Sequence, residues 1–164
     1  MCGLLGEVTF GCDLSSPNIF NDLLSLSSHR GPDVTQIETI ANRLRFGFNR
    51  LSIIDPSENS HQPIWSPSKR YLIVYNGEIY NHSELRTRLS GKGENIKGYG
   101  DTPTLAKCFD EWGIEKTISN LDGMFAIGVW DDLEKKISLI RDFAGVKPLY
   151  YGFDGRLLVF SSQY

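Results

Sequence analysis

The last third of the chain repeats one pattern, and that pattern limits the folds open to it. From Leu121 on, short apolar stretches alternate with turn residues and read GMFAIGVWD, KISLIRD, KPLYYG and LLVFSS. Such stretches predict β-strands, and their spacing is typical of an antiparallel meander. Apolar stretches nearer the N-terminus add further strands, so the sequence predicts a strand-rich α+β domain with helices outside its sheets.

Length and charge narrow the class of protein further. The 164 residues predict a single domain that is long enough to bury a sizeable core. The formal net charge of −3 gives no electrostatic reason to expect nucleic acid as a partner. No apolar run approaches the roughly 18 residues of a membrane span, and the N-terminus lacks the basic and apolar regions of a signal peptide. We therefore expect a cytoplasmic protein that binds neither nucleic acid nor membrane.

The cysteines support a reducing compartment. There are three, Cys2, Cys12 and Cys108, and they lack the paired spacing of metal ligands. An odd and sparse set argues against both a disulfide framework and a zinc site, so we expect no metal. We interpret Cys12 and Cys108 as structural, with Cys108 on the apolar face of a helix.

Three helices are predicted. The first begins at Ser16-Pro17, as a cap followed by Pro at the first helical position, and extends to about residue 28. The second covers residues 83–89 and stops at Gly91, and the third runs from Asp101-Thr102-Pro103 to Gly113. The predicted apolar residues are Ile19, Leu23, Leu24 and Leu26 in the first helix and Leu105, Cys108, Phe109 and Trp112 in the third.

Two loops carry many polar or glycine residues. HRGPD, residues 29–33, is a turn by its Gly-Pro content, and it could equally be a loop of a functional site. GKGENIKGYGD, residues 91–101, is rich in Gly but lacks the closing Gly-Lys-Ser/Thr of a phosphate-binding loop.

Cys2 is a candidate nucleophile because of its position in MCGLLG. A Cys side chain is small enough for a methionine aminopeptidase to accept, so Met1 can be removed to leave a thiol and a free amine on one residue. Their reference pKa values are about 8.5 and roughly 7.7 to 8.0, and an N-terminal amine can serve as the base that activates its own side chain. The alternative is an incidental buried Cys at the start of a strand.

Three further places have a structural and a functional interpretation each. RLRFGFNRLSIID predicts one long strand or two joined strands. Arg50 lies where this stretch changes from alternating to continuous apolar character, and it is either a strand-end charge or a carboxylate-binding group. Asn76-Gly77 in YLIVYNGEIYNH is the strongest short-range signal for a hairpin turn, and it could also form an oxyanion hole. Asp101 is either a helix cap or a ligand for an ammonium group.

Seven motifs in order connect these places. They are MCGLLG, HRGPD, RLSIID, YNGEIYNH, GYGDT, LDGMFAIGVWD and RDFAGVKPLYYG. In this combination the chain resembles the glutaminase domain of class II glutamine amidotransferases, which are N-terminal nucleophile hydrolases. The sequences of its motifs most closely resemble those of the domain in glutamine-hydrolysing asparagine synthetases, and the resemblance covers essentially the whole chain.

The resemblance implies a fold, a reaction and a set of site residues. The fold is a four-layer αββα sandwich with two antiparallel sheets. The reaction is the hydrolysis of glutamine to glutamate and ammonia through a thioester on Cys2. The resemblance assigns catalysis to Cys2, Asn76 and Gly77, the α-carboxylate of glutamine to Arg50 with backbone groups of Leu51 and Ile53, and the α-amino group to Glu78 and Asp101.

The resemblance also implies a longer protein. The chain ends at Tyr164, where the family continues its glutaminase domain, so residues 1–164 are interpreted as a glutaminase domain truncated at its C-terminal end. The family's ATP-dependent synthetase domain would use the ammonia to amidate aspartate or another carboxylate, with ATP and magnesium as its cofactors. No cofactor is expected in residues 1–164, and a homodimer is an open possibility. Gly100 also departs from the Ser that is common in the family.

Two alternatives stay open. One is a non-catalytic module that binds glutamine or another protein. The other is the glutaminase domain of a different class II amidotransferase, such as the phosphoribosyl or hexosamine-phosphate enzymes. These share the nucleophile but differ in the sequence of the motifs around the shared residues.

Overall fold

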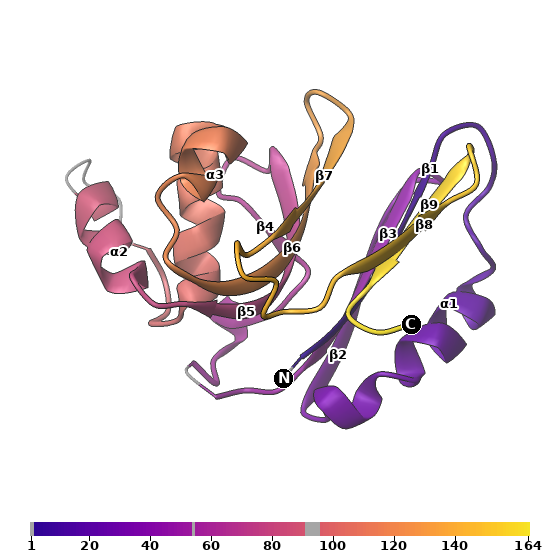
Figure 1. The fold of residues 1–164 in the computed structure, drawn as a ribbon, viewed down its shortest axis with the longest axis horizontal. Coiled ribbons are helices and arrows are strands. Elements are labelled where there is room, and N and C mark those ends of the chain that lie inside the picture. Colours follow the sequence, from indigo (N-terminus) through magenta and orange to yellow (C-terminus); the bar gives the residue numbers. More distant parts are fainter. Residues whose placement is uncertain (1, 54, 91–95) are drawn as a thin grey trace.

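Two β-sheets face each other in the middle of the molecule, with helices on their outer sides (Figure 1). This is a computed structural model, and it describes residues 2–53, 55–90 and 96–164. The strands within the described residues are β1 Gly3–Thr9, β2 Val34–Ile40, β3 Leu44–Arg50, β4 Ile64–Trp65, β5 Tyr71–Ile79, β6 Gly123–Asp131, β7 Lys136–Arg141, β8 Tyr150–Phe153 and β9 Leu157–Ser161. The helices there are α1 Pro17–Ser25, α2 His82–Ser90 and α3 Asp101–Ile118, with single 3-10 turns at Ser28–Arg30 and Glu58–Ser60.

The sheets are antiparallel throughout the described residues. One has five strands in the order β2-β3-β1-β9-β8, and the other has four in the order β4-β5-β6-β7. Helix α1 covers the five-stranded sheet, and α2 and α3 cover the four-stranded sheet (Figure 1). The layers are therefore helix, sheet, sheet and helix, as the αββα prediction requires.

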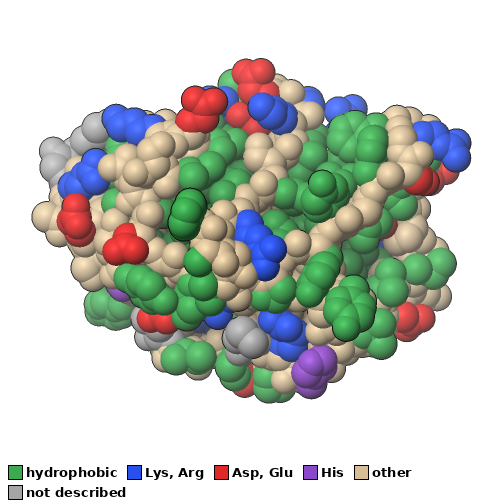
Figure 2. Space-filling model, viewed as in Figure 1, with side chains coloured by type: hydrophobic (Ala, Val, Ile, Leu, Met, Phe, Trp, Pro, Cys, Tyr) green, Lys and Arg blue, Asp and Glu red, His purple; other side chains and the backbone are tan. Residues whose placement is uncertain are grey.

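Apolar side chains fill the spaces between these layers. On the face shown in Figure 2, hydrophobic side chains gather over the middle of the molecule, between the sheets. The buried core between the sheets consists of Leu4, Val8, Leu44, Phe46, Phe48, Leu72, Val74, Trp130 and Phe160. Removing each large side chain of this kind from water stabilises the fold by about 1.5 to 3 kcal/mol. Edge-to-face packing of Phe46 on Phe160, with ring centroids 5.4 Å apart, joins the two strands that flank β1.

Strand β5 alternates between the two cores. Leu72 and Val74 face the core between the sheets, whereas Ile73 and Tyr75 face the core under α2 and α3. Because successive side chains of a strand point to opposite faces, the next residue, Asn76, lies on the face toward the other sheet. This alternation therefore directs the Asn76 side chain, near the C-terminal end of β5, toward the five-stranded sheet.

The predicted hairpin at Asn76-Gly77 is wrong. Both residues lie inside β5, which pairs with β6 along its whole length, with Gly77 opposite Phe125. A Cβ on Gly77 would come within 2.1 Å of the Met124 carbonyl oxygen. Gly is therefore required here by the close approach of β6 and not by a turn.

The predicted meander is wrong in its connectivity, although its four strands exist. β6 and β7 form a hairpin in the four-stranded sheet, and β8 and β9 form a hairpin in the five-stranded sheet. The chain crosses from one sheet to the other between residues 142 and 149. Two facing sheets can each hold one hairpin, which strand spacing alone does not distinguish from one continuous meander.

The first helix confirms its predicted cap but not its predicted apolar face. The Ser16 hydroxyl accepts a hydrogen bond from the Ile19 N–H at 3.3 Å. Phe20 and Leu24, four residues apart, are the buried positions that pack toward β1 and β3. The exposed members of the predicted face are Ile19, Leu23 and Leu26.

Two predicted element ends also need correction. β3 ends at Arg50, so the apolar residues after it do not continue the strand, and Ile54 lies outside the described residues. Gly113 does not end α3, because the helix resumes after a kink at this residue, where φ is +73°. The predicted stop at Gly91 and residues 91–95 of the Gly-rich loop lie outside the described residues.

Candidate active site

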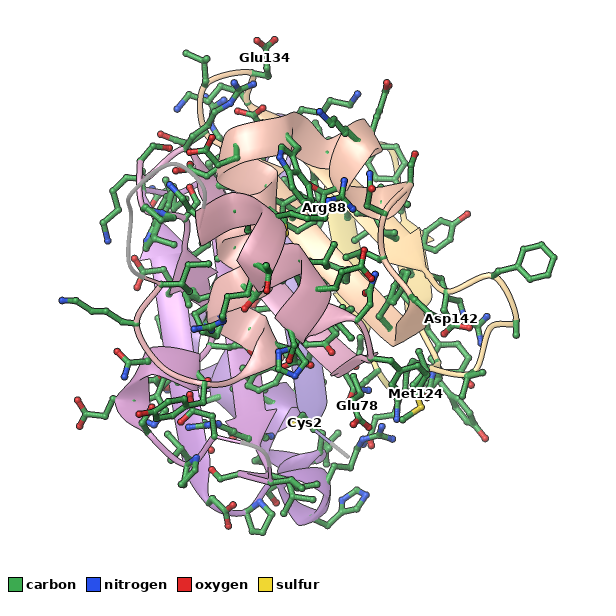
Figure 3. The ribbon with its side chains drawn as sticks, turned by 90° about the vertical axis from the view of Figure 1, so that its left-hand side faces the viewer. Cys2, Glu78, Arg88, Met124, Glu134 and Asp142 are labelled. Atoms are coloured by element: carbon green, nitrogen blue, oxygen red, sulfur yellow. The ribbon has the colours of Figure 1, made fainter. Side chains whose placement is uncertain are left out.

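One pocket of about 280 Å³ gathers all eight residues that the sequence singled out. It opens between the ends of β3 and β5, and its size is at the lower end of the range for small-molecule sites. The residues that line it are Cys2, Phe48, Arg50, Leu51, Ile53, Asp55, Ser60, Gln62, Tyr75, Asn76, Gly77, Glu78, Gly100, Asp101, Thr102, Met124 and Lys147. Figure 3 shows Cys2, Glu78 and Met124 near one another at this end of the molecule.

Cys2 precedes β1 and is held between backbone and cations. Its Sγ accepts a hydrogen bond from the Leu51 N–H at 3.4 Å, and its carbonyl oxygen accepts one from Arg30 Nε at 3.1 Å. Burial raises the pKa of the Cys2 thiol, although the backbone hydrogen bond with Leu51 and the positive charges of Arg50 and Arg30 oppose this. The thiol is therefore protonated near neutral pH, and nucleophilic attack needs a base to take the proton.

Arg50 is the last residue of β3 and is buried. Its guanidinium donates to the carbonyl oxygen of Ser57 at 3.0 Å and to that of Asp55. Within the described residues, carbonyl groups and not carboxylates hold this side chain. Its positive charge is therefore not neutralised, and it is available to an anionic ligand in the pocket.

Asp55 organises the wall beside Arg50, and it was missed from the sequence. Its carboxylate accepts hydrogen bonds from the Ser60 hydroxyl at 3.0 Å and from the N–H groups of Tyr99 at 2.9 Å and Gly100 at 3.1 Å. Burial would raise the pKa of Asp55, but the hydrogen bonds from Ser57, Tyr99 and Ser60 outweigh it and hold this pKa well below its usual range. Asp55 thus fixes two loops that are far apart in the sequence.

Beyond the two residues of β4, side chains complete the outer edge of β5. The Gln62 amide accepts from the Tyr75 N–H at 2.6 Å and donates to the Tyr75 carbonyl at 3.0 Å, as a backbone partner would. Gly77 and Ile79 follow Tyr75 at steps of two residues along the strand. The Ile79 N–H donates to Asp101 at 3.1 Å. Because alternate residues of a strand direct their N–H groups to the same side, the Gly77 N–H faces this edge and the pocket.

The partner strand supports this direction. Phe125, opposite Gly77, directs its N–H away from β5 to the carboxylate of Asp142 at 3.2 Å. The Asn76 side chain is buried, and its Nδ2 has no hydrogen-bond partner among the described residues. Such an unsatisfied donor is costly in a folded protein. Asn76 Nδ2 and the Gly77 N–H are thus two donors available to an anionic oxygen.

Asp101 is not a helix cap, which corrects the structural interpretation. The cap position is Gly100, without a side-chain hydrogen bond, and Asp101 is the first residue of α3. Its carboxylate instead accepts from the Tyr75 hydroxyl at 2.6 Å and from the Ile79 N–H. Burial and the charge of Asp101 raise the pKa of Tyr75, so this phenol stays a donor.

The other predicted residues line the pocket with fewer contacts. Glu78 is half-buried, and among the described residues no cation pairs with it. Leu51 offers its backbone N–H to Cys2, whereas the Ile53 side chain is 75% exposed at the rim. The other pocket residues, which were not predicted as site residues, are Phe48, Asp55, Ser60, Gln62, Tyr75, Gly100, Thr102, Met124 and Lys147. Asp55, Tyr75, Met124 and Lys147 lie inside motifs of the family resemblance, whereas Ser60 and Gln62 lie outside all seven motifs.

Two kinds of site are not formed by the described residues. They contain no group of three or more His, Cys, Asp or Glu side chains that could hold a metal ion. No helix in residues 2–53, 55–90 and 96–164 is long and apolar enough to cross a membrane.

Comparisons with known proteins agree with this geometry. Residues 1–164 match the glutamine amidotransferase domain family. Curated relatives include a putative glutamine-hydrolysing asparagine synthetase of Mycobacterium tuberculosis, 37% identical over 92% of this chain and 25% of its own, and asparagine synthetase 3 of Bacillus subtilis, 34% identical over 99% and 26%. The asparagine synthetase of Rattus norvegicus is 41% identical over 82% of this chain and 24% of its own. The chain thus spans about a quarter of the length of these relatives.

Solved structures show the same fold at lower identity. The glutamine phosphoribosylpyrophosphate amidotransferase of B. subtilis superposes with a TM-score of 0.74 at 20% identity, over 98% of this chain and 42% of that one. A second structure, described as the allosteric regulatory enzyme of purine biosynthesis, gives a TM-score of 0.78 at 19% identity over the same shares. The α+β class and the αββα sandwich are confirmed.

Proposed function

The chain belongs to the glutamine amidotransferase domain family, and from this premise we propose that it hydrolyses glutamine to glutamate and ammonia through a thioester on Cys2. The observation that supports this most strongly is one pocket that combines a thiol, an unneutralised Arg50 and two free donors at Asn76 and Gly77. A substrate with an anionic end and an amide end suits this arrangement.

The first half of the reaction forms the thioester. The Cys2 sulfur attacks the side-chain amide carbon of glutamine, and its proton passes to the Cys2 amine that removal of Met1 exposes. Asn76 Nδ2 and the Gly77 N–H stabilise the oxyanion of the tetrahedral intermediate. The amine then returns the proton to the leaving nitrogen, which departs as ammonia and leaves a γ-glutamyl thioester.

The second half hydrolyses the thioester. Water gives a proton to the Cys2 amine and attacks the thioester carbon, and the same two donors hold the second oxyanion. Cleavage of the carbon–sulfur bond releases glutamate and restores the thiol. The amine thus acts as base and then as acid in each half.

Charged residues of the pocket orient the substrate. Arg50 binds the α-carboxylate, assisted by backbone groups of Leu51 and Ile53. Glu78 and Asp101 hold the α-ammonium. For Asp101 the free atom is Oδ1, which has only a long 3.5 Å contact with the Thr102 hydroxyl, since Oδ2 is engaged by Tyr75.

For the full-length protein we propose an asparagine-synthetase-like amidotransferase. The relatives of 34% to 41% identity that carry this name support it, and they are about four times as long as this chain. In this proposal ammonia passes to a synthetase domain that uses ATP and magnesium to amidate aspartate or another carboxylate. We further propose a cytoplasmic location and leave a homodimer as a hypothesis for the full-length protein.

The test is glutamate release from glutamine by protein whose intact mass shows that Met1 is absent. The matched control is the same protein with one additional N-terminal residue, which blocks the Cys2 amine. We expect release from the first sample and none from the second. Equal rates would contradict the proposed base.

The two alternatives predict different outcomes. Glutamine binding without turnover by folded, Met1-free protein would favour a non-catalytic module. A phosphorylated sugar as the acceptor of the full-length enzyme would favour another class II amidotransferase.

A further inference from the structure

The pocket contains a second buried cation that the proposed mechanism does not use. Lys147 is 7% exposed and lines the pocket together with Cys2, Asn76 and Met124. Within the described residues its ammonium makes no hydrogen bond and no ion pair. A buried charge without a counter-charge is unfavourable, so this ammonium is a candidate to bind an anion that enters the pocket.

The backbone around Lys147 is firmly held. Its N–H donates to Asp142 Oδ2 at 3.0 Å, and its carbonyl oxygen accepts from Arg141 Nε at 2.7 Å. Asp142 Oδ1 also accepts from the Val146 N–H at 2.8 Å. These contacts make Asp142 a positioning residue for the loop, and Figure 3 shows Asp142 on the same side of the molecule as Met124.

The two buried cations are anchored on opposite sides of β5. Asp142 Oδ2 accepts hydrogen bonds from the N–H groups of both Phe125 and Lys147, so it links Lys147 to β6 at Phe125, the residue opposite Gly77. Arg50 is held by the segment that contains Asp55, which is on the side of β4 and α3. The Asn76 donor lies on β5, between these two sides.

We propose that Lys147 is a specificity-determining residue that faces the γ end of the bound amino acid and favours a ligand with a negative charge there. This rests on the proposed function, in which Arg50 binds the α-carboxylate. A five-carbon amino acid that extends from Arg50 past Asn76 then directs its γ group toward Lys147. Glutamine is neutral at this end, whereas the product glutamate carries a γ-carboxylate, so Lys147 strengthens product binding selectively.

The test compares the two ligands on a protein that cannot turn over. Met1-free Cys2→Ala protein is titrated calorimetrically with glutamine and with glutamate, alone and combined with Lys147→Met or the charge-preserving Lys147→Arg. We expect Lys147→Met to weaken glutamate binding about tenfold while glutamine binding changes less than about twofold. Lys147→Arg should keep the ratio of the two affinities.

The outcomes separate this inference from the proposed function. If glutamine binds but Lys147→Met weakens both ligands equally or neither, the γ-end role is wrong and the glutaminase proposal stands. If neither ligand binds with Lys147 intact, both proposals are overturned. Should Lys147→Met fail to fold by circular dichroism, glutamate is compared with its neutral γ-methyl ester on the Cys2→Ala protein, and equal affinities would overturn the inference.

Discussion

Two cysteines of this chain, Cys108 and Cys2, are shielded from water in different surroundings. Cys108 lies in the core between α3 and the four-stranded sheet, packed among apolar side chains, and burial raises the pKa of its thiol to about 12. Burial also raises the pKa of Cys2, but Leu51, Arg50 and Arg30 act against it. Burial alone makes a thiol inert, whereas a polar pocket keeps a buried thiol usable.

The difference extends from the cysteines to the regions around them. The helix-covered core consists of packed apolar side chains, so changes there should reduce stability and leave the chemistry intact. The pocket contains an unpaired donor on Asn76 and cations without carboxylate partners, so changes there should reduce the reaction and leave stability nearly intact. The following substitutions test this separation.

The largest effect is expected for the cysteines themselves. Cys2→Ala should abolish glutamate release, because no other nucleophile in the pocket can form the thioester. Cys108→Ala should leave turnover within about twofold but lower the free energy of unfolding by about 1 to 2 kcal/mol through the cavity it creates. Turnover assays measure the rate of glutamate release by both variants, and urea denaturation measures their free energy of unfolding. A fully active Cys2→Ala protein would contradict the mechanism.

A smaller effect is expected at the oxyanion donors. Asn76→Ala should lower kcat about 100- to 1000-fold with little change in KM, because the donor acts on the transition state. The control is Asn81→Ala, since Asn81 bonds to the Asn120 carbonyl outside the pocket. Steady-state kinetics decide, and a change in KM alone would assign Asn76 to ground-state binding.

The next effect concerns substrate orientation. Arg50→Lys should raise KM for glutamine about tenfold with kcat nearly unchanged, since an ammonium lacks the planar fork that binds a carboxylate in two places. Arg45→Lys, on the same strand but paired with Glu7 at 3.1 Å, is the control and should keep KM. Equal kinetics for both variants would remove Arg50 from the substrate site.

The smallest effect separates the thiols by pH. In protein that retains Met1, the raised pKa of Cys2 means less thiolate at a given pH, so alkylation of Cys2 by iodoacetamide should rise with pH and level off at a higher pH than alkylation of an exposed thiol. Cys108 should stay unmodified over the same pH range. Peptide mapping by mass spectrometry measures the extent of alkylation at each cysteine. Modification of Cys108 at the same rate as Cys2 would contradict the proposed difference between the two thiols.

The sequence predicted which residues share one pocket better than it predicted the local geometry of those residues. Cys2, Arg50, Asn76 and Asp101 were chosen because residue type and motif order point to one chemistry, and the structure brings them to one pocket. Their assigned roles stay predictions. Local signals misled at Asn76-Gly77, where the usual turn dipeptide lies within a strand because β6 passes so closely.

The residues that support the site could not be predicted. Asp55 and Gln62 act through partners far along the chain, on Gly100 and Tyr75, and neither stands in a local pattern that indicates such a contact. The same holds for the sheet to which each hairpin belongs. Tertiary contacts decide these features, and they overrule local propensity.

The completed edge of β5 has a consequence for solubility. A strand that presents a row of free N–H and C=O groups invites pairing with another chain and aggregation. Here β4 is only two residues long, but the Gln62 amide and the Asp101 carboxylate occupy the positions beyond it. The side chains that frame the pocket therefore also occupy the positions that a foreign strand would need to extend the sheet, and they leave the Gly77 N–H between them open to a small molecule.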